Sequence, residues 1–292
     1  MTADPFACHR SLLFTVAYEM LGSAADAEDV VQETWLRWAD VDSVARDAVR
    51  DPRAYLVRIV TRLALNRIRT LARRREEYVG PWLPEPLLTS PDVADDVELA
   101  DSVSFAMLTV LETLGPTERA VFVLREVFES PYEEIADALD RTPAAVRQIA
   151  HRARVHVAER RPRTRVSRAE QRAVVERFMA AVRDGDLQGL LDVLDPGVVL
   201  TSDGGGVVPA ARRPIHGAHI VAKLLTDIAR RVGAFSLTPI CLNGASAIRL
   251  DLGVDLHAVA SVVIDQGRIT RIYSVSNPHK LHRLSDAPAL SR

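Results

Sequence analysis

The chain has 292 residues, 48% of them apolar, and a formal net charge of −2. This length and apolar content predict two or three globular domains and exclude a disordered protein. No apolar run approaches the roughly 18 residues of a membrane span, and the N-terminus lacks the basic-then-apolar order of a secretory signal, so we expect a cytoplasmic protein. The two distant cysteines, Cys8 and Cys241, argue against a disulfide framework and a thiolate zinc site.

The near-neutral charge hides a strong segregation along the chain. Residues 1–52 contain 4 basic residues (Lys or Arg) and 10 acidic residues (Asp or Glu), and residues 53–75 contain 8 basic residues and no acidic one. Residues 76–140 contain 2 basic and 16 acidic residues, and residues 141–165 contain 8 basic residues and 1 acidic residue. Both basic blocks are entirely arginine, a side chain suited to bidentate contacts with phosphate and guanine. Two compact basic blocks in an acidic half predict two separate anion-binding surfaces.

The first predicted domain, residues 1–76, is helical throughout, because apolar residues recur at spacings of three and four. Its stretch "DAEDVVQETWLRWADV" predicts a helix whose inward face carries Ala27, Val31, Trp35 and Trp38. The outward face carries Asp29, Gln32 and Glu33. This acidic, amide-bearing face is too negative to contact phosphate. It fits either a protein partner or an ordinary solvated surface, and composition does not decide between them.

The first basic block, "RAYLVRIVTRLALNRIRTLARRR", predicts a longer amphipathic helix. One stripe of its surface is apolar: Val57, Val60, Ala64, Ile68 and Leu71. A nearly opposite stripe is formed by Arg58, Arg62, Asn66, Arg69 and Arg73. At 1.5 Å per residue, this cationic ridge is about 20 Å long and can follow a nucleic-acid backbone. Basic amphipathic helices also lie on membrane surfaces, so the ridge alone leaves that alternative open.

Residues 77–103 predict a linker, since they contain four prolines and many acids without a clear period, and Trp82 is expected to order part of it. Helical periodicity returns over 104–162. A third, α+β unit is expected over 168–284, followed by a tail at 285–292. This unit begins with helices across Arg168 to Arg183 and Leu187 to Leu194, and five β-like runs follow.

The second domain contains the pattern of a helix-turn-helix. In "SPYEEIADALD", Ser130 is expected to cap a helix, with Pro131 at its first position and Glu133 completing a capping box. A turn follows at Asp140 and Arg141. Thr142 and Pro143 then repeat the cap-plus-proline start of a helix, so two short helices joined by a tight turn are predicted.

The second helix of this pair, within "RTPAAVRQIAHRARVHVAERRPRTR", has two different faces. Its apolar side is formed by Val146, Ile149, Ala150, Ala153 and Val157. The candidate DNA-reading residues are Thr142, Ala144, Arg147, Gln148, His151 and Arg152. A glutamine can pair with adenine, and an arginine can pair with guanine or phosphate. The pattern indicates DNA binding, although a solvated arginine helix in a bundle has the same composition.

Three phrases in order resemble one family. "AEDVVQETWLRW", "DPRAYLVRIVTRLALNRIR" and "LGPTERAVFVLREVFESPYEEIADALDRTPAAVRQIAHRAR" together resemble bacterial extracytoplasmic-function sigma factors over residues 6 to 160. The resemblance implies that Asp29, Gln32 and Glu33 contact the clamp coiled coil of the RNA polymerase β′ subunit. It also implies a contact with the β flap, an arginine helix that faces the −10 promoter element, and a helix-turn-helix that reads the −35 element.

The third unit looks like a SnoaL-like domain, a cone-shaped curved sheet with helices packed on it. A subgroup of these sigma factors carries such an extension, and its phrases stand here as "WLPEP" at 82–86, "DGGGV" at 203–207 and "NPHKL" at 277–281. Val207 replaces a lysine of the pattern and His279 an aspartate, which puts contacts of those charges in doubt. The resemblance implies interdomain and regulatory roles for Trp82, Pro84, Asp203, Gly204, Gly205, Gly206, Asn277, Pro278 and Lys280.

The third unit could instead be an enzyme, because some SnoaL-like relatives are isomerases or hydrolases. Asp203, Asp255 and His257 are the candidate acid–base groups, and on a regular strand Asp255 and His257 would share a face. We expect no catalysis, since polar residues on the outer face give the same pattern. His216 and His219 lack a third metal ligand and are expected at a helix start on the surface. No metal and no cofactor are expected.

The sequence therefore predicts a multidomain protein, with two all-α sigma domains followed by an α+β SnoaL-like cone. The leading hypothesis is a sigma factor that binds core RNA polymerase and promoter DNA, and whose own C-terminal domain modulates it. A small ligand in the cone is one open trigger. The alternatives are a free-standing helix-turn-helix regulator and a DNA-binding module fused to an isomerase- or hydrolase-like enzyme.

Overall fold

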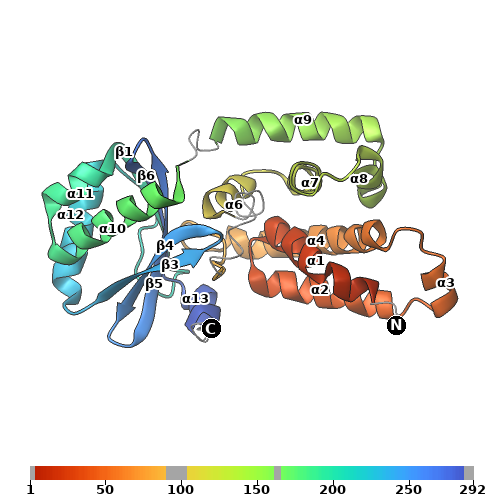
Figure 1. Cartoon of the computed structure of the whole chain (residues 1–292), viewed down its shortest axis with the longest axis horizontal. Helices are drawn as coiled ribbons and strands as arrows, with labels where there is room; N and C mark the ends of the chain where they lie inside the picture. The colour runs from red at the N-terminus through yellow and green to blue at the C-terminus, as the bar shows by residue number, and fades with distance from the viewer. Residues whose placement is uncertain (1–3, 90–103, 161–165, 286–292) are drawn as a thin grey trace. The chain divides into compact units, whose positions relative to one another are not determined.

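The computed structural model describes residues 4–89, 104–160 and 166–285, and the chain divides into two compact units. The first unit comprises Met1–Glu76 and Met107–Arg161, and the second comprises Glu77–Ala106 and Pro162–Arg292 (Figure 1). The segment that separates the two helical parts of the first unit thus belongs to the second unit. The chain enters each unit twice.

The first part of the helical unit contains four helices. They are α1 (Pro5–Leu21), α2 (Ala24–Ala39), α3 (Ser43–Asp47) and α4 (Pro52–Glu76). Gly22, in the left-handed region at φ 65°, ends α1, and the Ser23 hydroxyl caps α2 by accepting from the Asp26 N–H at 3.2 Å. Helices α1, α2 and α4 pack on one another around buried Leu13, Val16 and Val60.

The second part of this unit is also helical, as the periodicity predicts. Its elements are α6 (Phe105–Leu111), α7 (Pro116–Phe122), the π-helical turn η2 (Val123–Val127), α8 (Tyr132–Leu139) and α9 (Pro143–Arg160). The π turn is a feature that the apolar spacing does not predict. It is followed by Glu129 in the left-handed region at φ 52°, so the chain reaches α8 along a path unlike that of a regular helix.

Among the described residues of the second unit, helices pack on a six-stranded sheet. The helices are α10 (Arg168–Asp184), α11 (Leu187–Val193), α12 (Ala218–Val232) and α13 (Pro278–Ser285). The strands are β1 (Leu194–Asp203), β2 (Ile215–His216), β3 (Ser236–Leu242), β4 (Ala245–Leu252), β5 (Asp255–Asp265) and β6 (Arg268–Val275). These elements confirm the expected α+β class. The sequence indicates only a helix start near His216 and His219, whereas α12 extends for 15 residues.

The strands lie in the order β2-β1-β6-β5-β4-β3, and only β1 and β6 pair in parallel. Each later pair is a hairpin with a tight turn, such as Asn243–Gly244, where both residues have positive φ. The parallel pairing of β1 with β6 brings Asp203, the last residue of β1, opposite Val275. The two motif phrases of this unit therefore meet at one end of the sheet.

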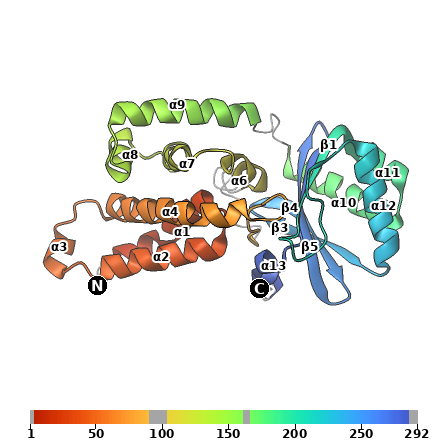
Figure 2. The ribbon, with the colours of Figure 1, turned by 180° about the vertical axis from the view of Figure 1, so that it is seen from behind.

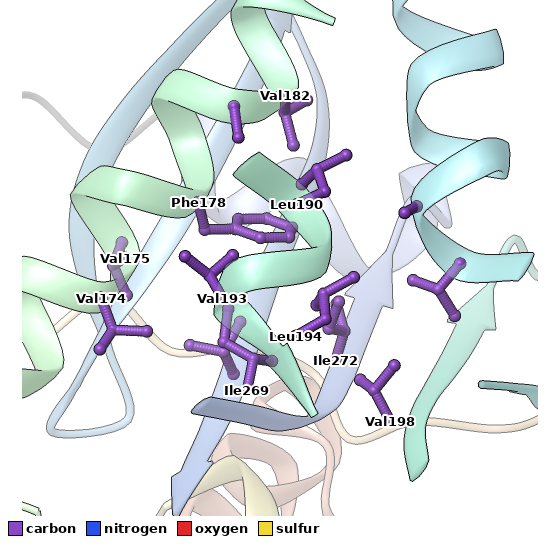
Figure 3. Close-up of a cluster of buried hydrophobic side chains, with 14 of the residues drawn as sticks. Val174, Val175, Phe178, Val182, Leu190, Val193, Leu194, Val198, Ile269 and Ile272 are labelled. Atoms are coloured by element: carbon purple, nitrogen blue, oxygen red, sulfur yellow. The ribbon is translucent and has the colours of Figure 1, made fainter. Parts of the chain in front are cut away.

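Both faces of the sheet are covered by apolar side chains. On one face, α10 and α11 bury Val174, Phe178 and Leu190 against Ile269 and Ile272 of β6 (Figure 3). The other face forms a second cluster with residues from α13, Phe105 and the linker residue Leu83. Figure 2 shows these layers from behind. The linker is thus part of the core of the second unit.

Candidate nucleic-acid interface and linker-binding site

The turn between α8 and α9 is built by local hydrogen bonds. Asp140 has φ 53°, the left-handed conformation of a helix C-cap, and its N–H and that of Arg141 both donate to the Ala136 carbonyl. The Thr142 hydroxyl accepts from the Ala145 N–H at 3.2 Å, so the predicted cap of α9 is confirmed. A helix-turn-helix is present at the predicted residues.

The expected capping box of α8 is wrong. The N-cap residue of α8 is Pro131, which makes no side-chain cap bond. The Ser130 hydroxyl is buried and has no hydrogen-bond partner among the described residues. The physical reason is the preceding π turn with Glu129 at positive φ, which directs Ser130 into the protein: its N–H donates to the Leu124 carbonyl at 2.9 Å.

The two faces of α9 lie as predicted. Val146, Ala150, Ala153 and Val157 are buried, and Ile149 is half-buried. Arg147, Gln148, His151 and Arg152 are exposed and together line a shallow hollow of about 420 Å³. Thr142 and Ala144 are exposed near the start of the helix. The structure therefore brings four of the six candidate DNA-reading residues together on one accessible surface of α9, and the other two are exposed near the start of the helix.

The ring of Tyr132 contacts one of these residues, Arg147, and the sequence does not predict this contact. The Tyr132 ring lies 5.8 Å from the Arg147 guanidinium carbon and 4.6 Å from that of Arg125. Arg125 in turn donates to the Ser130 carbonyl at 3.0 Å. The aromatic at the start of α8 thus connects the π turn to the exposed face of α9. A Tyr and an Arg 15 residues apart give no sequence signal for such a contact.

The ridge of α4 differs from the expected open stripe. Asn66 and Arg69 are exposed, and Arg58 is half-buried with its guanidinium 5.3 Å from the Tyr55 ring. Arg62 is engaged within the first unit: its side chain donates to the Ala138 carbonyl at 2.9 Å and contacts the α8–α9 turn. The Arg73 side chain lies outside the described residues. The ridge is therefore only partly available to an outside partner.

The outward face of α2 is exposed at Asp29, Gln32 and Glu33. Arg67 of α4 bridges Asp26 and Asp29 at 2.6 and 3.3 Å, and Arg37 pairs with Glu33 at 2.7 Å. These charges are therefore partly neutralised within the first unit.

The inward placement of Trp35 is wrong, because its side chain is 44% exposed. Val30, Val31, Thr34 and Trp38 complete the buried face of α2, and Trp35 lies at its edge. Leu36 next to it is 53% exposed. An apolar pair thus adjoins the polar residues predicted on this face.

In the second unit, the buried carboxylate of Asp203 gathers four donors. Its Oδ1 accepts from the Tyr78 hydroxyl at 2.5 Å and the Gly205 N–H at 3.0 Å, and its Oδ2 accepts from the Leu83 N–H at 2.9 Å and Lys280 Nζ at 2.7 Å. Asp203 is 1% exposed. Two donors for each oxygen satisfy a carboxylate, and two of the four come from the linker.

Lys280 extends this network to the rest of the motif. Its ammonium lies 4.0 Å from the Trp82 ring centroid and 5.1 Å from that of Tyr78, and it donates to the Leu83 carbonyl. The Asn277 amide donates to the Tyr78 hydroxyl at 2.8 Å. Burial first, and then the hydrogen bond to Asp203, raise the pKa of Tyr78, which keeps the phenol protonated as a donor.

The glycines of "DGGG" provide room for these contacts. Gly205 and Gly206 have φ of 63° and 73°, and a Cβ on Gly205 would overlap the Asn277 amide, while one on Gly206 would press on Val79 at 3.1 Å. A Cβ on Gly204 would overlap the Val208 carbonyl. Three glycines are needed at 204–206 because this tight loop packs against both Asn277 and the linker.

The linker also adds to the edge of the sheet. Its residues 87–89 pair with the end of β3: the Asn243 N–H donates to the Leu87 carbonyl at 2.9 Å, and the Thr89 N–H donates to the Cys241 carbonyl at 3.0 Å. Pro84 and Glu85 between the two attachment points are buried. Strand addition of this kind protects an otherwise open sheet edge.

The remaining motif residues lie outside this network. Val207 and His279, which replace charges of the family pattern, are both exposed, as is Pro278. Val207 lines a hollow of about 260 Å³ with Val79, Gly80 and Arg212. The two departures therefore leave the Asp203 network complete.

The candidate acid–base groups do not form a catalytic pair. Asp203 is fully used by its four donors, and Asp255 is exposed at the β4–β5 hairpin. His257 is the additional residue of a β-bulge, because Leu256 pairs with Asp251 and Ala258 with Leu250. The bulge breaks the regular alternation on which the shared face of Asp255 and His257 depends.

None of the helices in residues 4–89, 104–160 and 166–285 combines the length and the apolar character needed to cross a membrane. Within the same ranges, no three His, Cys, Asp or Glu side chains come together as a metal site would require.

Comparison with known proteins shows similarity along nearly the whole chain. Residues 6–74 match the family model described as Sigma-70 region 2, and residues 104–157 match that described as Sigma-70, region 4. The chain is 37% identical to the ECF RNA polymerase sigma factor SigJ of Mycobacterium tuberculosis (strain ATCC 25618 / H37Rv), over 96% of this chain and 93% of that protein. It is 35% identical to the probable ECF RNA polymerase sigma factor SigI of Mycobacterium tuberculosis (strain CDC 1551 / Oshkosh), over 94% and 93%. The crystal structure of Mycobacterium tuberculosis SigJ matches with a TM-score of 0.76 and 34% identity, over 95% of this chain and 97% of that chain.

Proposed function

The chain belongs to the extracytoplasmic-function RNA polymerase sigma factors, and we propose which of its surfaces contact core RNA polymerase and which contact promoter DNA. It is a transcription factor that acts with core RNA polymerase and promoter DNA. It carries a C-terminal SnoaL-like domain after the two sigma domains.

The exposed face of α9 reads the −35 element. Its candidate residues combine an amide, a histidine and two arginines beside small residues at the helix start, which is the composition of a helix that enters the major groove. Asn66 and Arg69, two exposed residues of the α4 ridge, contact the −10 element, and Arg58, Arg62 and Arg73 belong to the same proposed surface.

The outward face of α2 meets core polymerase. Gln32 and Glu33 lie beside the exposed Trp35 and Leu36, so this surface offers both polar groups and apolar area. Interfaces between proteins favour such a mixture, with an aromatic residue near the centre. By family resemblance the partner is the clamp coiled coil of β′, and the β flap meets the second sigma domain.

The C-terminal domain controls the sigma domains by holding their linker. The observation that carries this proposal is the Asp203 carboxylate, which takes two of its four hydrogen bonds from Tyr78 and Leu83 of the linker. Residues 78–89 could span at most about 40 Å if fully extended. Holding them on the C-terminal domain limits how far apart the two sigma domains can reach, so release of the linker should favour promoter engagement.

Run-off transcription with purified core RNA polymerase tests this function. The template is a fragment from upstream of the gene itself, and the proteins are the full chain, a truncation ending at Arg165 and the full-length Asp203→Asn variant. Asp255→Asn is the matched control, because it makes the same substitution at an exposed carboxylate of the same domain.

We expect initiation that depends on the protein, and more of it with the truncation and with Asp203→Asn than with the wild type or Asp255→Asn. DNA binding without initiation by any form would favour a free-standing regulator instead. Equal initiation by all forms would support a sigma factor but reject control through the linker.

A further inference from the structure

The carboxyl end of α8 contacts Arg62, an arginine that the proposed function assigns to DNA binding. The guanidinium of Arg62 donates to three acceptors: the Ala138 carbonyl at 2.9 Å, the Asp137 carbonyl at 3.1 Å and the Asp140 carboxylate at 2.6 Å. Carbonyls in the last turn of a helix have no partner within the helix, and the helix dipole makes this end negative. Arg62 therefore binds a compact site of three partly or fully negative oxygens.

This site presents the chemistry of a phosphate group. An arginine recognises phosphate by directing several N–H groups at neighbouring oxygens that share a negative charge. The α8 end offers the same arrangement with two peptide oxygens and one carboxylate. The left-handed conformation of Asp140, at φ 53°, places the carboxylate beside the carbonyls.

Two other arginines join the same two parts of the first unit in a similar way. Arg119 of α7 is buried and donates to the Glu19 carbonyl in the last turn of α1 at 2.8 Å. Arg53 of α4 donates to the Phe128 carbonyl, just after the π turn, at 3.4 Å. The Arg62 contact is thus one of three contacts from arginines to helix ends. Of these three arginines, Arg62 is the one that belongs to the ridge of α4.

We propose that the carboxyl end of α8 with Asp140 is a built-in competitor for nucleic-acid phosphate at Arg62. In this closed arrangement the helix-turn-helix of one sigma domain engages the hydrogen-bond donors of a phosphate-binding position of the other. Binding of a DNA backbone to α4 exchanges the α8 oxygens for phosphate oxygens and separates the two sigma domains. The inference rests on the proposed role of α4 in DNA binding.

The variant that tests it is Asp140→Asn, compared with Asp137→Asn. Asparagine tolerates the left-handed conformation, so the turn is kept while the carboxylate is lost. Asp137 lies at the same end of α8 and contributes only its carbonyl to Arg62, so its substitution removes an equal charge without removing the contact. Asp140→Gly serves as a second variant that keeps the turn, and the thermal unfolding midpoint checks the fold of each.

The first readout is the affinity of the full chain for a fluorescent single-stranded 20-mer of thymidine. We expect Asp140→Asn to bind it about 3- to 5-fold more tightly than Asp137→Asn, the range of a partly exposed ion pair. The gain should disappear when both are placed in an Arg62→Ala background. Equal affinities of the two variants would overturn the proposal, and so would a gain that persists without Arg62, because it would then be a general charge effect.

The second readout involves neither DNA nor polymerase, so it separates this inference from the proposed function. Spin labels at Val44→Cys in α3 and Val155→Cys in α9, with both native cysteines replaced by serine, report the distance between the sigma domains in the full chain. Asp140→Asn should shift the distribution toward longer distances, and Asp137→Asn should not. Identical distance distributions for the two variants would overturn the proposed competition at Arg62, even if the protein initiates transcription.

Discussion

The exposed face of α9 and the Asp203 site use charge in opposite ways. On α9, Arg147 and Arg152 lie at the surface and line an open hollow. At the Asp203 site, a carboxylate and an ammonium are buried, with side-chain exposures of 0% and 11%, and every donor to the carboxylate comes from the chain itself. The first arrangement leaves charged side chains accessible at the surface, whereas the second holds a segment of the same protein.

The difference predicts different consequences of substitution. Losing an exposed charge should leave the fold intact and weaken a binding event, since surface substitutions change the stability little. Losing one member of a buried, hydrogen-bonded pair leaves the other without compensation and should destabilise the unit that contains it.

The largest effect is expected for Asp203→Asn. The variant leaves Lys280 without its carboxylate and directs an amide at four donors, which should lower the free energy of unfolding of the second unit by about 3–5 kcal/mol. Hydrogen exchange of β1 and of residues 78–89, followed by mass spectrometry, measures the loss. Asp255→Asn should change it by less than about 0.5 kcal/mol, and similar losses for both variants would remove the distinction between the two regions.

A smaller loss, of about 2–3 kcal/mol, is expected for Gly205→Ala, which combines a strained φ with overlap of the Asn277 amide. Gly253→Ala is its matched control, because Gly253 has nearly the same φ of 65° and no atom within 4 Å of the added Cβ. We expect about 1 kcal/mol for the control. If chemical denaturation gave equal losses, backbone strain alone would explain the glycine.

On α9, Arg147→Ala should weaken binding to the protein's own promoter by about 1–3 kcal/mol, the value of one base or phosphate contact. Arg177→Ala removes the same charge from the exposed surface of α10 and should leave binding unchanged. Fluorescence anisotropy on promoter DNA with holoenzyme measures both. A thermal midpoint of Arg147→Ala that falls as far as that of Asp203→Asn would contradict the surface role.

The smallest effect is expected at Tyr132, whose ring adjoins Arg147. Tyr132→Leu should weaken promoter binding by about 0.5–1 kcal/mol through loss of the cation–π contact, and Tyr132→Phe should retain most of it. The same anisotropy measurement applies. If Tyr132→Leu had no effect in an otherwise wild-type chain, Arg147 would not depend on this ring for its position.

The α9 surface could be predicted from the sequence because its determinants are local. Thr142 caps the helix, the apolar residues repeat at helical spacing, and the exposed residues follow from the same geometry. Ser130 shows the limit of this reasoning, since a π turn before it redirects a side chain that fits the capping pattern.

Contacts between distant segments could not be obtained in this way. Tyr78 lies 125 residues from Asp203 along the chain, and only the family resemblance of the motifs suggested that these regions act together. Arg62 occupies the predicted outward stripe of α4, yet α8 packs against it, because a helical wheel shows which side is polar and not what covers it. The predicted inward placement of Trp35 was wrong for the converse reason, because its neighbours on α2 already fill the buried face.

If the linker controls initiation, the mobility of the linker and the level of initiation should change together, and one paired measurement shows whether they do. For the wild type, Tyr78→Phe, Asp203→Asn and Gly205→Ala, hydrogen exchange of residues 78–89 is measured alongside run-off transcription with core RNA polymerase. We predict that initiation rises from variant to variant as the linker exchanges faster, toward the level of the truncation at Arg165. Faster exchange with unchanged initiation would contradict control of initiation through the linker.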